Sequence, residues 1–116
     1  MLLSFGRIEL RGYIDENGNK RFANWLEQLD PSAAAKVTIA LTRMEQGNFS
    51  KAKGVGTGVC EYKIDFGPGY RIYFGRDGER LVILIGGGTK KRQQRDIAAA
   101  QECWADYKRR KKQETP

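Results

Sequence analysis

The chain has 116 residues, of which 40% are apolar and 30% are charged, and its 21 Lys or Arg against 14 Asp or Glu give a formal charge of +7. A chain of this length forms one domain with a core, so we expect a single domain over residues 1–116 with a basic, frayed tail over 108–116. Histidine is absent, and Cys60 and Cys103 are far apart, which excludes the usual Cys/His zinc patterns and predicts no metal and no cofactor.

The N-terminal residues predict a first strand. Apolar and charged residues alternate over the stretch 5–10, and the pattern ends at Gly12. Few apolar residues precede the first charge, which argues against a signal peptide, and no window approaches the ~20 apolar residues of a membrane span. We therefore expect a cytoplasmic protein that does not contact a membrane, with both cysteines reduced or, alternatively, paired.

Two helices are predicted next. The first carries an apolar stripe at the i, i+3, i+4, i+7 spacing, namely Phe22, Trp25, Leu26 and Leu29. The second opens at Asp30, which precedes a proline at the first helical position, and stops at Gly47. Its stripe consists of Ala34, Val37, Leu41 and Met44. The short link predicts an antiparallel helical hairpin that needs a sheet to cover its apolar side.

Three strands follow, over residues 59–66, 70–76 and 80–86, and the last two are joined by the turn dipeptide Asp77-Gly78. Residues 81–85 are apolar on both faces, which places this strand centrally in the sheet. A run of three glycines ends it and leads to a last helix with the stripe Ile97, Ala100, Trp104 and Tyr107. The predicted fold is α+β in the order β-α-α-β-β-β-α, a twisted, antiparallel-rich sheet with a helical hairpin and a C-terminal helix packed against it.

The last helix carries most of the positive charge. Residues 90–112 include nine Lys or Arg against three acids. Such a field attracts polyanions, and RNA, DNA and acidic protein segments all qualify. The run KRRKK over 108–112 is interpreted as a solvated helix end.

The stretch EYKIDFGPGYRIYF, residues 61–74, predicts a β-hairpin with one apolar face. A three-residue loop over 67–69 would set Asp65 opposite Arg71 and Lys63 opposite Tyr73. The face that these side chains share with Glu61 is either the solvated side of a sheet or a site, and spacing alone leaves both interpretations open.

The polar face has the groups that RNA cleavage by transesterification needs: a base, cations for the phosphate and an acid. Lys63 and Glu61 are the candidate bases, Arg71 is the best phosphate clamp, and Tyr73 is placed to stack on a base. The segment GGGTKK would add backbone donors with Lys90 and Lys91, although it lacks the Walker spacing. Further RNA-binding candidates are Lys51, Lys53, Arg92 and Arg95.

The element order, GVCEYKIDFGPGYRIYF, the turn GGGTKK and QQRDIAAA together resemble the RelE/ParE superfamily of bacterial toxins, and most closely the HigB-like "addiction module killer protein" branch. The resemblance implies a ribosome-dependent mRNA endonuclease of a type II toxin–antitoxin module, with Lys63 on a catalytic lysine, Arg71 on the arginine of the GYR motif, and Lys90 or Lys91 on the basic position after the central strand. Asp65 stands where RelE has a second lysine.

The resemblance also implies partners: a protein antitoxin, HigA-like and of the helix-turn-helix type, the ribosome and mRNA, with operator DNA reached only through the antitoxin complex. Two other functions are weighed. The first is a ParE-like, non-enzymatic inhibitor of DNA gyrase or another topoisomerase. The second is a basic nucleic-acid-binding accessory protein that uses its C-terminal lysines.

Overall fold

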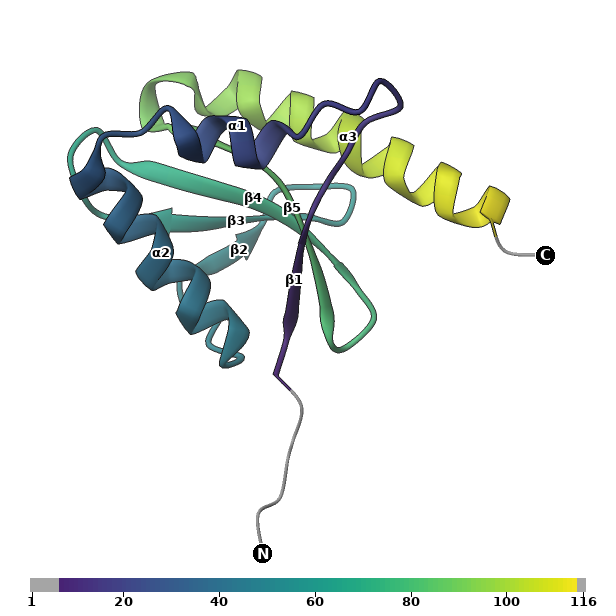
Figure 1. Ribbon diagram of the computed structural model, residues 1–116, viewed down its shortest axis with the longest axis horizontal. Coiled ribbons are helices and arrows are strands. Elements are labelled where there is room, and N and C mark those ends of the chain that lie inside the picture. The colour runs from purple at the N-terminus through teal and green to yellow at the C-terminus, as the bar shows by residue number, and fades with distance from the viewer. Residues whose placement is uncertain (1–6, 115–116) are drawn as a thin grey trace, which may run out of the picture.

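A five-stranded sheet separates two layers of helix in the computed structural model, which describes residues 7–114 (Figure 1). The strands follow the spatial order β1-β5-β4-β3-β2, and all neighbours are antiparallel except β1, which is parallel to β5. Their bounds are β1 (Glu9–Gly12), β2 (Ala52–Gly54), β3 (Val59–Ile64), β4 (Tyr70–Asp77) and β5 (Leu81–Thr89). The predicted α+β class is confirmed, and β5 lies inside the sheet between β1 and β4, although the middle strand is β4. The start of the predicted first strand, residues 5–6, lies outside the described residues.

The helices begin close to where their sequence signals predict. They are α1 (Arg21–Glu27), α2 (Pro31–Glu45) and α3 (Gln93–Glu114), the last preceded by the 3-10 helix η1 (Lys90–Arg92). The Asp30 side chain caps α2 by accepting a hydrogen bond of 2.9 Å from the Ala33 N–H, with Pro31 at the first helical position. Helix α3 continues through the basic run to Glu114.

Each face of the sheet has its own core. Helices α1 and α2 cover one face, where Phe22 and Met44 pack with Tyr62, Ile72 and Phe74. Helix α3 covers the other, where its buried residues Ala100 and Trp104 pack with Val59, Tyr73, Ile83 and Ile85. The period-two apolar face predicted for the hairpin is therefore confirmed. Within the described part of the chain, no helix is long and apolar enough to cross a membrane.

Two features of the sheet differ from the prediction. The segment 52–54, which is not among the predicted strands, forms the edge strand β2, where it pairs with residues 60–62 of β3. The glycine run, expected to be a turn, belongs to β5, which extends to Thr89. A bulge interrupts its pairing with β4: Tyr73 lies opposite Gly86 while Phe74 lies opposite Leu84, so that Ile85 is the extra residue.

The glycines of β5 let both helix layers approach the strand closely. A Cβ atom on Gly87 would lie 2.3 Å from the Trp25 ring of α1, and one on Gly88 would lie 1.9 Å from a carboxylate oxygen of Asp96 in α3. No side chain fits at either position without displacing its neighbour. The glycine run therefore allows close packing of the helices on β5, and it is not a loop that is open to a phosphate.

Candidate functional site

The hairpin of β3 and β4 pairs the predicted site residues differently from the prediction. Lys63 lies opposite Arg71, and Glu61 lies opposite Tyr73. The predicted pairs of Asp65 with Arg71 and of Lys63 with Tyr73 are wrong by a shift of two residues. The shift arises because the connection between the strands, residues 65–69, is five residues long rather than three.

The longer loop still keeps the predicted faces. Gly67 and Gly69 adopt positive φ angles of 54° and 78°, and the Gly69 N–H donates to the Phe66 carbonyl at 3.0 Å. A shift of two residues preserves the side to which every side chain points, because the strand period is two. The polar side chains therefore share one face, as predicted, in a different register.

This polar face is covered by α3 and is not the solvated side of the sheet. Only 1% of Glu61, 4% of Arg71 and 1% of Tyr73 is exposed, and Glu61 and Arg71 are the buried charged residues of the described chain. Burial of ionised groups is costly unless they are paired and hydrogen-bonded. The contacts of these three side chains therefore decide what the site can do.

Glu61 is held by the first residue of α3. The side-chain amide of Gln93 donates to both carboxylate oxygens, at 3.1 and 2.8 Å. Lys53, the register partner of Glu61 on β2, brings its ammonium group to 4.0 Å from the same carboxylate. Gln93 thus lies over Glu61 and closes it off from the groove beside the start of α3.

Arg71 is pinned below the surface. Its Nη1 donates to the Gly69 carbonyl at 2.7 Å, so the guanidinium group holds the end of the 65–69 loop. Its Nε lies 3.9 Å from a carboxylate oxygen of Glu61 and has no hydrogen-bond partner among the described residues. Arg71 therefore keeps part of its donor capacity unused inside the site.

The Tyr73 hydroxyl is the second buried polar group that lacks a hydrogen-bond partner among the described residues. Burial, reinforced by the nearby Glu61 carboxylate, raises the pKa of Tyr73 well above its ordinary value. The group therefore stays protonated at neutral pH. Its ring is enclosed by α3, so the predicted stacking on an RNA base is not possible in this conformation.

Exposed cations surround this buried cluster at the same end of the sheet. Lys63 is exposed and forms an ion pair of 3.5 Å with Asp65. The Lys90 N–H donates to the Gly69 carbonyl at 2.9 Å, which ties η1 to the hairpin loop. A shallow groove continues from there along the start of α3, lined by Lys90, Lys91, Arg92, Gln93, Gln94 and Arg95.

The structure thus brings Lys63, Arg71 and Lys90 to one end of the sheet, as the cleavage hypothesis requires. Arg71 lies beneath the surface while the two lysines are exposed. Lys51 is also close, since its carbonyl accepts a hydrogen bond from the Lys63 N–H at 3.1 Å, and both lysines line a pocket beside α2. Lys53 lines an adjoining groove, which shares Gln93 with the groove along the start of α3.

Two residues of the site were not predicted. Gln93 covers Glu61, and Asp96 packs on the backbone of Gly88, directly opposite Arg71 in the sheet register. Partial burial raises the pKa of Asp96 above its ordinary value, against the opposing effect of nearby arginines. The only signal for either residue was its place in QQRD, immediately after the basic segment.

The comparisons with known proteins identify the family of the chain. The model of the family described as phage derived protein Gp49-like (DUF891) matches residues 24–104, which include β3, β4, β5 and most of α3. An uncharacterised protein of Haemophilus influenzae is 41% identical over 80 residues, which cover 68% of this chain and 81% of that relative. The chain therefore belongs to the Gp49-like family, which is part of the RelE/HigB-like toxin superfamily.

Proposed function

We propose that this protein is the toxin of a type II toxin–antitoxin module and that it cleaves mRNA on the ribosome. The observation that carries the proposal is the juxtaposition of exposed Lys63 and Lys90 with buried Arg71 and Glu61 at one end of the sheet. Membership in the Gp49-like family supports it. Exposed cations bind the phosphate backbone, and the buried groups fix the geometry around it.

The proposed reaction is an internal transesterification. The ribose 2′-oxygen attacks the adjacent phosphorus, the bond from phosphorus to the 5′-oxygen breaks, and the products are a 2′,3′-cyclic phosphate and a free 5′-hydroxyl. One group removes the 2′-hydroxyl proton, and another returns a proton to the leaving oxygen. Cations stabilise the additional negative charge of the pentavalent phosphorus, which is where preorganised charge has its largest effect on rate.

The burial of each residue suggests its role in this reaction. Lys63, Lys90 and Lys91 are exposed and contact the phosphate, and Lys63 exchanges protons with the substrate. Arg71 adds positive charge from beneath and holds the 65–69 loop through Gly69, which makes it a positioning residue. Glu61 is the second candidate base, and it takes part only when Gln93 moves off its carboxylate.

The proposed partners follow from the same reading. An acidic protein antitoxin, HigA-like and of the helix-turn-helix type, would neutralise the cationic end of a chain with a charge of +7. The ribosome would present the message already bent, and this orientation can be worth several orders of magnitude in rate. Operator DNA would be reached only through the antitoxin complex.

The test compares exposed cations inside and outside the site, because substitution of buried Arg71 would perturb the fold. Lys63→Gln and the double variant Lys90→Gln/Lys91→Gln should relieve growth arrest and suppress new RNA ends after induction. The double variant Lys20→Gln/Arg80→Gln removes two exposed cations elsewhere and should remain toxic. Mapping of RNA ends with and without ribosomes shows whether cleavage needs the ribosome. Equal toxicity and identical cleavage in all variants would overturn the site.

A ParE-like inhibitor of a topoisomerase is the second candidate function. The observation in its favour is the burial of Glu61, Arg71 and Tyr73, which leaves a cationic binding surface rather than an open catalytic cleft. Such an inhibitor would leave message intact and cause DNA damage after induction. The same mapping of RNA ends therefore distinguishes the two functions.

A further inference from the structure

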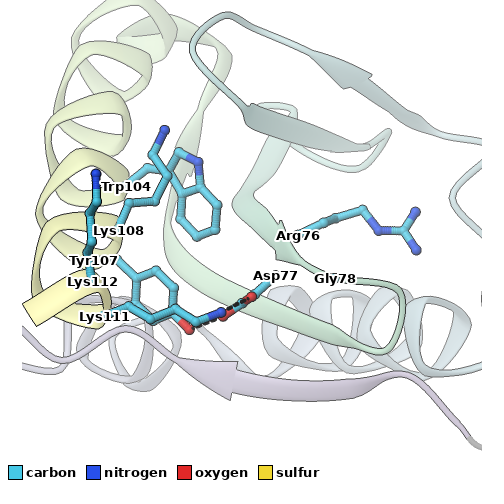
Figure 2. Close-up of a pocket in the computed structure, with 8 residues that line it drawn as sticks. All are labelled: Arg76, Asp77, Gly78, Trp104, Tyr107, Lys108, Lys111 and Lys112. Atoms are coloured by element: carbon cyan, nitrogen blue, oxygen red, sulfur yellow. Dashed lines mark hydrogen bonds and ion pairs between the residues drawn. The ribbon is translucent and has the colours of Figure 1, made fainter. Parts of the chain in front are cut away.

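A second cationic site lies at the opposite end of the sheet from the cluster around Arg71. A groove of about 400 Å³ separates the turn after β4 from the C-terminal half of α3, and residues from both segments line it (Figure 2). The 8-residue strand β4 joins the two ends, which at ~3.3 Å per residue are roughly 25 Å apart. A ligand in this groove would leave the 65–69 loop uncovered.

Two aromatic side chains that are already packed against each other form the floor of the groove. Trp104 and Tyr107 stack with ring centroids 5.1 Å apart and an interplanar angle of 5°. The backbone of Gly75 abuts the Trp104 ring, since a Cβ atom there would lie 2.5 Å from it. Trp104 is 5% exposed, so it offers no free ring face on which a nucleobase could stack.

The rim of the groove is positive on the side of α3. Lys108, Lys111 and Lys112 line it together with one acid, Asp77, whereas the Arg76 guanidinium points away from it and lies 4.5 Å from the centre of the Phe49 ring. That acid is already occupied by the Tyr107 hydroxyl and by Lys111, as the dashed lines in Figure 2 show. Lys108 and Lys112 extend from the same side of α3, and the Lys108 ammonium group lies 5.9 Å from the centre of the Trp104 ring.

We propose that this groove binds an acidic protein segment in which carboxylates flank an apolar side chain. The methylene stems of the lysines and the edges of the rings make its walls apolar, while the ammonium groups at the rim are placed to meet carboxylates. An RNA strand satisfies this arrangement less well, because phosphates leave the apolar walls uncovered and the stacked rings accept no base. The inference does not depend on the proposed ribonuclease activity.

The binding test uses the full chain and short labelled probes. A fluorescein-labelled peptide in which glutamates flank two leucines should bind, and its counterpart with serines in place of the leucines should bind more weakly. The double variant Lys108→Glu/Lys112→Glu should weaken binding of the leucine peptide by about tenfold at low salt. Fluorescence anisotropy measures each affinity, and circular dichroism checks that the variant keeps its helix content.

A matched control separates this groove from the overall charge. The double variant Lys20→Glu/Arg80→Glu makes the same change in net charge at exposed positions outside the groove, and it should bind the leucine peptide within about twofold of the unmodified protein. Equal losses in both double variants would overturn the proposal, as would absence of peptide binding. A labelled oligouridylate whose affinity depends on Lys108 and Lys112, where that of the peptide does not, would show instead that the groove binds RNA.

Discussion

The first and the last turns of α3 meet charged side chains in opposite ways. At its start the helix covers Glu61 and Arg71, and the Nε of Arg71 has no hydrogen-bond partner among the described residues. In the C-terminal half of α3, each of two acids is contacted by a tyrosine hydroxyl and by a basic side chain. Asp77 contacts Tyr107 and Lys111, and Asp106 contacts Tyr13 and Arg110, respectively.

The difference separates the part of the interface that anchors α3 from the part that holds buried charge. Paired acids and phenols at the edge of the sheet fix the helix at modest cost. Buried charge with unused donor capacity lowers the stability of a fold. The apolar and paired half of α3 therefore anchors the helix whose first turn covers the candidate site.

The largest expected effect removes the anchor. Trp104→Ala should lower the free energy of unfolding by about 3–5 kcal/mol, because it deletes a buried indole that Gly58 and Gly75 have left room for. Urea unfolding measures the loss. Ala105→Ser, at an exposed position on the same helix, should change the stability by less than about 0.5 kcal/mol. If Trp104→Ala also cost less than about 0.5 kcal/mol, α3 would be held chiefly by the contacts of its first turn.

The second prediction concerns the buried charges. Glu61→Ala should cost roughly 3 kcal/mol, because Arg71 is then buried without a counter-charge. The double variant Glu61→Leu/Arg71→Met replaces both charges by apolar groups and should be more stable than either single substitution. Urea unfolding of the unmodified protein, Glu61→Leu, Arg71→Met and the double variant closes the cycle. Additive losses would show that the two side chains do not depend on each other.

A smaller effect is expected at the paired end. Tyr107→Phe removes the hydroxyl that donates to Asp77 and should cost about 1 kcal/mol, since Lys111 still contacts the carboxylate. Thermal unfolding is sufficient to measure this. A cost equal to that of Glu61→Ala would erase the contrast between the two ends of α3.

The smallest expected effect is the pH dependence of stability, which has opposite signs at the two ends of α3. Burial raises the pKa of Asp96 above its ordinary 3.8, so its ionised form lowers stability and stability rises as the pH falls through the folded value. Hydrogen bonds from Lys111 and Tyr107 lower the pKa of Asp77, so its ionised form stabilises the fold above 3.8, and this gain is lost as the pH falls through the lowered value.

Two amide variants test these signs. At neutral pH, Asp96→Asn should raise the thermal midpoint slightly and Asp77→Asn should lower it. Both differences should shrink as the pH falls through the folded pKa values of the two carboxyl groups. Shifts of the same sign in the two variants at neutral pH would contradict the assigned environments.

Local patterns predicted the elements well where one residue type determines the geometry. Asp30 followed by Pro31 fixed the start of α2, and the period of two assigned the faces of β3 and β4 correctly. The register escaped prediction because loops of three and five residues satisfy the same facing rule. The glycine run was misread as a turn, since its strand character depends on Trp25 and Asp96, which are distant in sequence.

The candidate site was predicted in its composition and not in its burial. The polar residues of the hairpin were found because they share one face. Whether that face is covered depends on which side of the sheet receives α3, and its stripe of Ile97, Ala100 and Trp104 fits either side equally well. Gln93 escaped notice because an amide at a helix start has no distinctive spacing.

The bulge at Ile85 shifts the register of β5 against β4 by one residue partway along the strand. Without it, Gly87 would lie opposite Arg71 and Gly88 opposite Tyr70, so that the space for Trp25 and the space for Asp96 would exchange sides. The apolar half of β5 and its glycine half are thereby aligned independently, each with its own helix. Mutations that repack the apolar half of β5 can therefore accumulate without rotating its glycine half. The backbone beside Arg71, at the floor of the candidate functional site, is then unchanged.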